Sequence, residues 1–241
     1  MKIVVDEQFR HLTDTIARLP QMMDEGRGEV VYDSRNRVAR FTIDGLSLMV
    51  KRFKRVNAVQ QVVYTFFRKT KAERAYTYAT EFLRRGIDTP QPVAYMEERH
   101  HSLFTIGYFV SLETPGTETS LLLREVQDYP HDLAEAVARQ VVLMHDKGIL
   151  HGDPNLSNFL VTTRPDGTFR FTMIDINRSH FCNGIPSDEE CLKNMVRLTH
   201  RRDLYEDLVR RYASLRGWDA DETARRSLAL LTRFERRKLK L

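Results

Sequence analysis

The stretch LMHDKGILHGDPNLSNFLV, residues 143–161, places a polar island between two apolar runs. The island HGDPNLSN, residues 151–158, combines histidine, aspartate, two asparagines, glycine and proline. Glycine, proline, asparagine and aspartate favour turns over regular helix or strand. The preceding helix is predicted to end at Gly148, and the apolar residues 159–161 are typical of a strand. We therefore expect a loop that is held between two rigid elements.

A second strand is predicted shortly after this loop. The segments NFLVT (158–162) and FRFTMIDI (169–176) flank the turn sequence RPDG, which is typical of a hairpin. Such a hairpin places Asn158 near its open end, close to Asp153 and to Asp175 at the end of the second strand. Two carboxylates and an amide oxygen are ligands that Mg²⁺ takes together with substrate phosphates. The sequence therefore predicts a phosphoryl-transfer site.

The composition is that of a compact globular protein. The 241 residues are 41% hydrophobic and 29% charged, which is enough for one large domain or two small lobes sharing a cleft. The net charge of +5 favours anionic partners. The first sixteen residues carry acids where a secretory signal is apolar, and no segment approaches the ~18 apolar residues of a membrane span. We therefore expect a cytoplasmic protein, with Cys182 and Cys191 as free thiols rather than zinc ligands.

The first half of the chain is predicted to be rich in strands. Residues 28–54 alternate as three short strands, with DSRN and DG as turns. Residues 57–85 have helical spacing and are predicted to form one helix that ends at Gly86. Two further strands are expected at 93–96 and within SLFTIGYFVSLE, residues 102–113. Residues 1–113 are therefore predicted to form a β-rich lobe with one main helix.

The second half of the chain is predicted to be mainly helical. Helices are expected over 119–129 and 131–148, and most of 187–241 also has helical character. Only the hairpin near residue 160 interrupts this pattern. The prediction is therefore an α+β protein with a β-rich lobe, residues 1–113, and a helical lobe, residues 114–241. A ligand cleft is expected between two such lobes.

These residues also carry a family resemblance. LMHDKGILHGDPNLSNFLV followed by FTMIDINR resembles the catalytic core of the protein-kinase-like superfamily, and more closely its small-molecule branch, in which H-G-D replaces H-R-D. With NRVARFTIDGLSLMVKRFK and GIDTPQPVAY, residues 28–181 resemble the lipopolysaccharide core kinases, the Kdo/WaaP family of Gram-negative bacteria. The resemblance implies a bilobal kinase-like fold with an ATP cleft between the lobes, and ATP and Mg²⁺ as cofactors.

The resemblance also implies a role for each residue that matches the kinase pattern. Asp153 would accept the proton of the attacking hydroxyl, and Asn158 and Asp175 would hold the metal ions that bridge the ATP phosphates. Lys51, at the end of an apolar strand, would contact the α- and β-phosphates. Its expected partner is Glu73 on the following helix, with Glu81 as the second choice.

Two departures from the kinase pattern affect these expectations. No G-x-G-x-x-G precedes the first strand, and the turn in its place contains Ser34, Arg35 and Asn36. We expect the backbone N–H groups of this turn and its arginine to bind the ATP phosphates instead. Asn177 replaces the final glycine of D-F-G, which leaves the metal-binding aspartate in place and suggests a site without an activation-loop switch.

Each of these residues also has an ordinary structural interpretation. Aspartate and asparagine stabilise turns in all kinds of protein, and only their combination favours catalysis. Lys51 stands beside other basic residues, as a solvated strand-end lysine would, and Glu73 has the position of a surface salt-bridge partner. His151 is expected to hold the loop through hydrogen bonds and to transfer no proton.

The predicted function is ATP-dependent phosphorylation of a sugar hydroxyl in the lipopolysaccharide inner core, on Kdo or heptose. A protein kinase or an aminoglycoside-type phosphotransferase is the alternative, although no A-P-E follows the hairpin and Asn155 stands where Ser/Thr protein kinases usually have lysine. A pseudokinase would lack Lys51, Asp153 or Asp175, and all three are present. No zinc-finger, RNA-recognition or helix-turn-helix signature is found, so no nucleic-acid partner is expected.

The end of the chain is basic. Its last 17 residues hold seven lysines and arginines against one glutamate, and apolar residues such as Leu228, Leu230, Leu231 and Phe234 are interleaved with them. Such a tail suits docking on an anionic membrane, whereas a solvated helix face is its ordinary interpretation. A lipid-linked acceptor on the cytoplasmic face would place the protein peripherally on the inner membrane.

Overall fold

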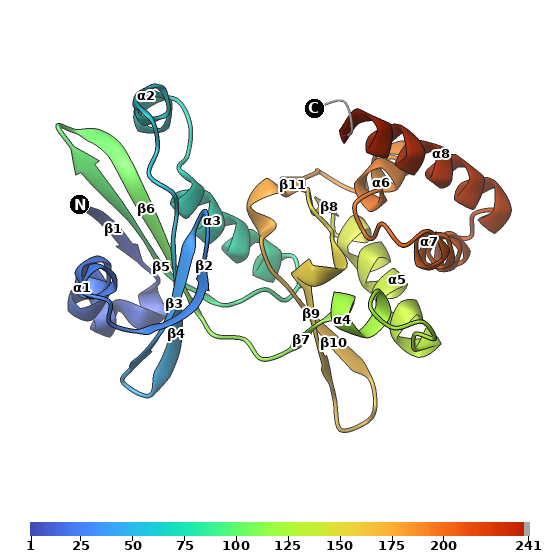
Figure 1. Ribbon diagram of the computed structural model, residues 1–241, viewed down its shortest axis with the longest axis horizontal. Helices are drawn as coiled ribbons and strands as arrows, with labels where there is room; N and C mark the ends of the chain where they lie inside the picture. The colour runs from blue at the N-terminus through green and yellow to red at the C-terminus, as the bar shows by residue number, and fades with distance from the viewer. Residues whose placement is uncertain (239–241) are drawn as a thin grey trace. The chain divides into compact units, whose positions relative to one another are not determined.

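The computed structural model describes residues 1–238 and consists of two compact units. One contains residues 1–84 and 89–114, and the other contains residues 85–88 and the chain from Pro115 onward. The first unit is built around a β-sheet and the second is mostly helical (Figure 1). The α+β fold class expected from the sequence is therefore confirmed. Among residues 1–238, no helix has both the length and the apolar composition that a bilayer-crossing segment needs.

The sheet of the first unit has six antiparallel strands in the order β1-β5-β6-β4-β3-β2. The strands are β1 (Lys2–Val5), β2 (Glu29–Asp33), β3 (Arg37–Ile43), β4 (Leu46–Arg52), β5 (Pro92–His100) and β6 (Leu103–Leu112). The predicted DG turn joins β3 to β4, and Asp44 and Gly45 both have positive φ angles, 50° and 75°. A two-residue hairpin turn with this backbone matches the natural twist of the strands.

Helices cover both faces of this sheet (Figure 1). The short helix η1 (Glu7–Leu12) and α1 (Thr13–Asp24) pack Ile16 and Leu19 against strand residues such as Val50. On the other face, α3 (Lys71–Arg84) packs Ala72 and Ala75 against a smaller cluster. The sequence did not predict β1 or α1. Pro20 lies inside α1 and cannot donate the helical hydrogen bond, which weakens the local helix signal.

The single helix predicted for residues 57–85 is wrong. The chain forms α2 (Ala58–Phe66) and then α3, with residues 67–70 between them. Thr70 causes the second helix to start anew, because its hydroxyl oxygen accepts a hydrogen bond from the Glu73 N–H at 3.1 Å. The same hydroxyl donates to the buried carboxylate of Glu97 at 2.8 Å. This tertiary contact attaches the start of α3 to β5. The local sequence around Thr70 does not predict it, because Glu97 lies 27 residues away.

The described part of the second unit combines five α-helices with short strands. The helices are α4 (Thr119–Leu123), α5 (His131–Asp146), α6 (Asp188–Met195), α7 (Arg202–Arg216) and α8 (Ala220–Lys238). A three-stranded sheet has the order β10-β9-β7, with β7 (Thr117–Glu118), β9 (Phe159–Thr163) and β10 (Phe169–Met173). A two-stranded sheet pairs β8 (Ile149–Leu150) with β11 (His180–Phe181). The helix predicted over 119–129 is thus shorter, because α4 ends at Leu123.

A buried polar cluster joins three helices of the second unit. The Tyr212 hydroxyl on α7 lies 2.8 Å from Nδ1 of His145 on α5, and Nε2 of His145 lies 3.2 Å from the Asn194 side-chain oxygen on α6. Arg216 donates to the Tyr212 hydroxyl at 3.0 Å. Burial lowers the pKa of His145 to about 4, so the ring is neutral at physiological pH. A neutral ring can accept from the tyrosine and donate to the asparagine, which satisfies all three groups.

The short segment 85–88 belongs to the second unit although its neighbours on both sides belong to the first. The Arg85 guanidinium donates to the carbonyls of Lys147 (2.7 Å) and Cys182 (3.0 Å). The Asp88 carbonyl accepts from the Met173 N–H at 2.8 Å, and its carboxylate pairs with Arg170 at 2.7 Å. These bonds fasten the segment to the end of α5 and to β10.

Candidate active site

The hairpin of β9 and β10 supports the candidate site. Its register pairs Phe159 with Met173, and one further hydrogen bond, from the Ile174 N–H to the Asn158 carbonyl at 2.9 Å, continues the ladder beyond the paired residues. Asn158 and Asp175 therefore lie at the same end of the hairpin, next to two paired strands. This is the arrangement that the strand pattern predicted for these residues.

The loop 151–158 is fastened to this end of the hairpin. The Asn158 side-chain amide donates to the Asp153 main-chain carbonyl at 2.9 Å. This bond uses the amide nitrogen of Asn158 and leaves its oxygen available to a ligand. Asn155 caps the short helix η2 (Leu156–Asn158), because its side-chain oxygen accepts from the Ser157 N–H at 3.0 Å. The structure thus brings Asp153 and Asn158 together through a main-chain contact.

His151 is a buried structural residue of the loop. Its Nε2 lies 3.1 Å from the Ile174 carbonyl, and its Nδ1 accepts from the Asp153 N–H at 3.4 Å. A carbonyl can only accept, so Nε2 carries the proton and Nδ1 is the acceptor. Burial lowers the pKa of His151, which favours this neutral form. The ring therefore connects the loop to the end of β10, as the sequence interpretation expected.

Gly152 allows the loop to approach the segment that follows β10 very closely. A Cβ atom at this position would lie 2.0 Å from the main-chain oxygen of Arg178, in η3 (Ile176–Arg178). Only glycine fits such an approach. Arg178 also extends its guanidinium to the Asp153 carboxylate, at 3.5 Å. The glycine of the H-G-D sequence therefore positions Asp153 beside an arginine that the sequence reading did not single out.

Asp175 stands in an unusual backbone conformation. Its φ angle of 52° places it in the left-handed region, which residues other than glycine adopt at a cost of ~1–3 kcal/mol. The side chain is exposed. Two residues later, the Asn177 side-chain oxygen is buried and makes no hydrogen bond. The exposed carboxylate of Asp175 and the unsatisfied buried oxygen of Asn177 next to it support a ligand site at this end of the hairpin.

The donor set fits a magnesium ion better than zinc. No group of three or more histidine, cysteine, aspartate or glutamate side chains within residues 1–238 is arranged to hold a metal. The donors at the hairpin are instead the Asp175 carboxylate and the side-chain oxygen of Asn158, while the Asp153 carboxylate at the same end pairs with Arg178. Mg²⁺ is bound in this way, through one or two carboxylates, with substrate phosphates and water completing its shell. The two cysteines are free thiols.

Lys51 lies in the first unit, near the end of β4. It pairs with Val38 on one side and Phe109 on the other, and its ammonium lies 5.6 Å from the Phe53 ring centroid. Its side chain therefore stands on the sheet face that α3 covers, because Phe53 and Phe109 belong to that face. The lysine reaches the face on which a glutamate of α3 was expected.

The two glutamates proposed as partners of Lys51 lie on α3. Glu73 is in the first turn and pairs with Lys69 at 3.9 Å, whereas Glu81 forms a two-bond contact with Arg84 at 2.6 and 2.7 Å. Both glutamates are partly buried. The pairing of either residue with Lys51 stays a prediction.

The turn between β2 and β3 is closed by local hydrogen bonds. The Ser34 N–H donates to the Asn36 carbonyl at 3.1 Å, and the Asn36 side-chain oxygen accepts from the Lys54 N–H at 3.2 Å. Ser34 and Arg35 are exposed, and Asn36 is partly buried. The expected contact of this turn with ATP phosphates stays a prediction, and within the turn it would depend on Arg35.

A family model matches residues 21–211, which is most of the chain: the lipopolysaccharide kinase (Kdo/WaaP) family. The chain belongs to this family. The resemblance seen in the sequence is thereby confirmed. Among characterised members, the 3-deoxy-D-manno-octulosonic acid kinase of Photobacterium profundum is 23% identical over 145 residues, which cover 57% of this chain and 61% of that protein.

A solved structure of the family shares the fold. The structure described as WaaP in complex with acyl carrier protein aligns with a TM-score of 0.64 and 23% identity, over 100% of this chain and 99% of that chain. This agreement supports the kinase-like α+β fold. The match to the Photobacterium kinase, by contrast, spans less than two thirds of that protein's length.

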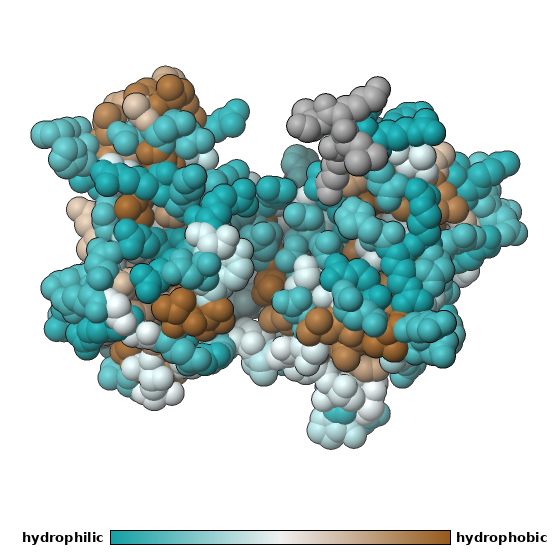
Figure 2. All heavy atoms as spheres, viewed as in Figure 1, coloured by the Kyte–Doolittle hydropathy of each residue, from teal (hydrophilic) through white to brown (hydrophobic). Residues whose placement is uncertain are grey.

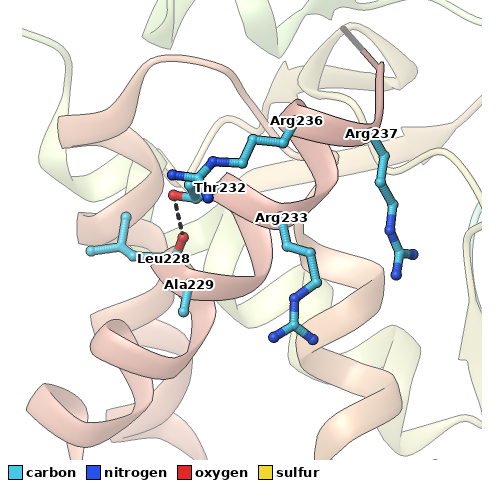
Figure 3. Close-up of a pocket in the computed structure, with 6 residues that line it drawn as sticks. All are labelled: Leu228, Ala229, Thr232, Arg233, Arg236 and Arg237. Atoms are coloured by element: carbon cyan, nitrogen blue, oxygen red, sulfur yellow. Dashed lines mark hydrogen bonds between the residues drawn. The ribbon is translucent and has the colours of Figure 1, made fainter. Parts of the chain in front are cut away.

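The sequence reading missed a basic groove between α6 and α8 of this family member. Lys193 and Arg197 line a pocket of about 260 Å³ with Gly152 of the loop and Glu190, and both also line the adjoining groove with Glu189, Arg233 and Arg237. Lys193 pairs with Glu189 at 2.5 Å, so cations outnumber carboxylates in the groove by four to one. Figure 3 shows Arg233 and Arg237 extending from the same side of α8. Within residues 1–238, Arg233, Arg236 and Arg237 form no ion pair. Only the packing of α6 against α8 brings these cations together, so no local motif marks them.

Proposed function

We propose that this protein is a kinase that transfers the γ-phosphate of ATP to a sugar hydroxyl of the lipopolysaccharide inner core, on Kdo or heptose. The observation that carries the proposal is the fastening of the Asp153 loop to the hairpin through Asn158, in a chain of the Kdo/WaaP family. Phosphoryl transfer depends mainly on positioning and on charge stabilisation, so a rigidly held aspartate and amide suit it.

Each residue of the site has a proposed role. Asp153 accepts the proton of the attacking sugar hydroxyl, and its carboxylate is oriented by Arg178 at 3.5 Å. The oxygen of Asn158 and the carboxylate of Asp175 would hold Mg²⁺, which would supply charge neutralisation at the phosphate oxygens of ATP. His151, neutral and buried, fixes the loop and takes no part in proton transfer.

The first unit is proposed to supply the remaining contacts to the nucleotide. Lys51 contacts the α- and β-phosphates, and Glu73 or Glu81 on α3 orients it. The backbone N–H of Arg35 and its guanidinium contact the phosphates in place of a glycine-rich loop. A lysine on the α3 face of the sheet supports the first of these roles.

The acceptor is proposed to use the basic groove beside the loop. Inner-core sugars and lipid A carry carboxylate and phosphate groups, which Lys193 and Arg197 can bind next to Gly152. Arg197 is held in place by stacking on the Phe234 ring at 4.8 Å. The groove therefore offers cations next to the residue that precedes the proposed base.

The basic end of the chain is proposed to contact an anionic membrane, which would place the protein peripherally on the cytoplasmic side of the inner membrane. Arg233, Arg236 and Arg237 are exposed on α8 and support this contact. Residues 239–241, which complete the predicted tail, lie outside the described residues.

The proposed function is tested by incubating the protein with labelled ATP, Mg²⁺ and Kdo-bearing lipid A, intact or deacylated. Label is expected on the sugar, and the Asp153→Asn variant serves as the inactive control. Label on polypeptide alone would indicate a protein kinase, and label on an aminoglycoside alone would indicate the other alternative. Nucleotide binding without transfer to any acceptor would indicate a pseudokinase.

A further inference from the structure

The helix α2 is attached to the protein by only one of its faces. The Tyr64 ring contacts the Phe104 ring edge-to-face at 5.8 Å, and the Thr65 hydroxyl oxygen accepts from the Phe104 N–H at 2.9 Å. The same hydroxyl donates to the main-chain carbonyl of Gln61 at 2.6 Å. No residue of α2 is fully buried. The helix therefore lies on the surface of the first unit, beside β6.

The opposite face of α2 is apolar and faces solvent. Val59, Val62 and Phe66 have the i, i+3, i+7 spacing of one helical stripe, and they are 73%, 43% and 68% exposed. Phe67, the next residue, is 77% exposed. Figure 2 shows hydrophobic side chains gathered over α2. A surface helix normally turns its apolar stripe inward, so this reversed orientation marks an interaction surface.

Positive charges flank this apolar stripe at both ends. Lys54 and Arg55 precede α2, Arg68 and Lys69 follow it, and all four are exposed. Between residues 45 and 72 the sequence contains no aspartate or glutamate. Lys69 contacts Glu73 at 3.9 Å, and the other three cations form no ion pair within residues 1–238. An apolar stripe flanked by four cations, three of them without an ion pair among the described residues, matches a surface with an apolar interior and anionic headgroups.

We propose that α2 and Phe67 form a membrane-docking element that enters the headgroup region of an anionic phospholipid bilayer. Val59, Val62 and Phe66 would contact the acyl chains, while the cations at both ends bind lipid phosphates. A second copy of the chain is a poorer occupant, because its α2 would bring the same positive charges against these. The site belongs to the first unit, whereas the basic tail on α8 belongs to the second.

The inference deepens the proposed function, on which its biological meaning rests. Lipid A is held in a membrane, and docking there would raise the concentration of a lipid-linked acceptor around the enzyme. Binding of α2 to lipid can nevertheless be measured with no acceptor and no ATP present. The two proposals can therefore fail separately.

The first experiment measures sedimentation of the protein with vesicles of phosphatidylglycerol and phosphatidylethanolamine, and with vesicles of phosphatidylcholine alone. Wild type is expected to bind the anionic vesicles and to be released by salt. The double variant Phe66→Ser, Phe67→Ser is expected to lose about tenfold or more in binding, because it removes two large apolar side chains from the bilayer. The matched control is Ile185→Ser, which alters another well exposed apolar residue, 62% exposed and in the second unit, and should bind like wild type.

A second experiment compares two acceptors. The double variant should phosphorylate vesicle-embedded Kdo-lipid A more slowly than wild type, and deacylated soluble acceptor at the wild-type rate. If wild type labels neither acceptor, the proposed function fails, and the vesicle assay still decides the role of α2. An unchanged melting temperature shows that both substitutions leave the fold intact, as expected for exposed side chains.

Three results would overturn the inference. One is wild type that ignores anionic vesicles, and another is a double variant that binds them as wild type does. The third is a stable wild-type dimer, or a complex with an acidic protein, that the double variant cannot form while vesicle binding is absent. Phe66→Trp offers an independent readout, because its fluorescence should shift to the blue when anionic vesicles are added.

Discussion

The side-chain amide of Asn158 donates a hydrogen bond to the main-chain carbonyl of Asp153 across 2.9 Å. Three residues earlier, Asn155 uses its side chain in the opposite sense, because its oxygen accepts from the Ser157 N–H. The hydrogen bonds of the two asparagines therefore use different side-chain atoms, the amide nitrogen in Asn158 and the oxygen in Asn155. Aspartate can replace the acceptor of Asn155 but not the donor of Asn158.

Asn158→Asp should destabilise the protein by about 1 kcal/mol, because it removes the donor and places a carboxylate oxygen near a carbonyl. Phosphate transfer should fall by about 10- to 100-fold, the usual effect of losing a group that positions a site. The matched control, Asn155→Asp, keeps its acceptor and should change both quantities little. Urea unfolding and steady-state kinetics measure the effects. Equal behaviour of the two variants would contradict the assigned hydrogen bonds.

Asp153→Asn should abolish transfer and leave nucleotide binding intact, because it removes the proposed base and no phosphate contact. ATP with Mg²⁺ at ~100 times its dissociation constant should still stabilise the variant by about 2.7 kcal/mol, as measured by thermal unfolding. Asp166→Asn, in the exposed turn of the hairpin, is the control and should be fully active. A fully active Asp153→Asn enzyme would refute the role of this carboxylate.

Gly152→Ala should damage both stability and activity. The new Cβ would meet the Arg178 main chain, and backbone cannot move aside as a flexible side chain can, so a cost of about 1–3 kcal/mol is expected. Gly167→Ala is the control, because a Cβ there meets nothing within 4 Å. Its φ of 80° still costs about 1–2 kcal/mol, but activity should be retained. The comparison fails if both variants lose activity alike.

The stability of the protein should fall in acid because of His145. The pKa of His145 is about 4 in the folded state and near 6.5 in the unfolded state. Between these two pH values, the unfolded chain therefore binds a proton at His145 that the folded chain does not bind. The contribution is present above pH 6.5 and is lost as pH falls to 4, by about 3 kcal/mol in total. His145→Asn should flatten the pH dependence of the unfolding free energy in this range. His11→Gln, an exposed control, should not.

The double variant Lys193→Gln, Arg197→Gln should weaken binding of the acceptor and leave nucleotide binding unchanged. KM for Kdo-lipid A should rise about tenfold or more, because two charge-assisted contacts are lost, while KM for ATP stays the same. Arg139→Gln, on the surface of α5, is the control. A rise in KM for ATP instead would assign the groove to the nucleotide.

Local pattern was sufficient for much of the fold. The turn at Asp44-Gly45, the hairpin of β9 and β10, and the end of α5 at Asp146, just before Gly148 with its positive φ, each depend on residues adjacent in sequence. The structure places the end of this helix two residues before the predicted Gly148. The break between α2 and α3 could not be foreseen, because it depends on Thr70 bonding to the distant Glu97. Pro20 likewise concealed α1, which tertiary packing stabilises.

The candidate site, like the fold, was predictable from the sequence only in part. Asp153, Asn158 and Asp175 could be placed at one end of a hairpin from spacing alone. Arg178 was not singled out, because its approach to Asp153 requires the close contact of Gly152 with η3. The solvent-facing apolar side of α2 could not be predicted from the sequence, for a different reason. Its apolar spacing is that of any surface helix, and only the fold shows which side faces solvent.

The segment 85–88 has a consequence for how the chain can be divided. The polypeptide passes between the two units at residues 84–85, 88–89 and 114–115, so neither unit is one continuous piece of sequence. A fragment cut at residue 114 would carry Arg85 and Asp88 away from the carbonyls, the N–H and the guanidinium that they bind in the second unit. Fragments expressed separately should therefore be unstable, and the chain should unfold as one cooperative system.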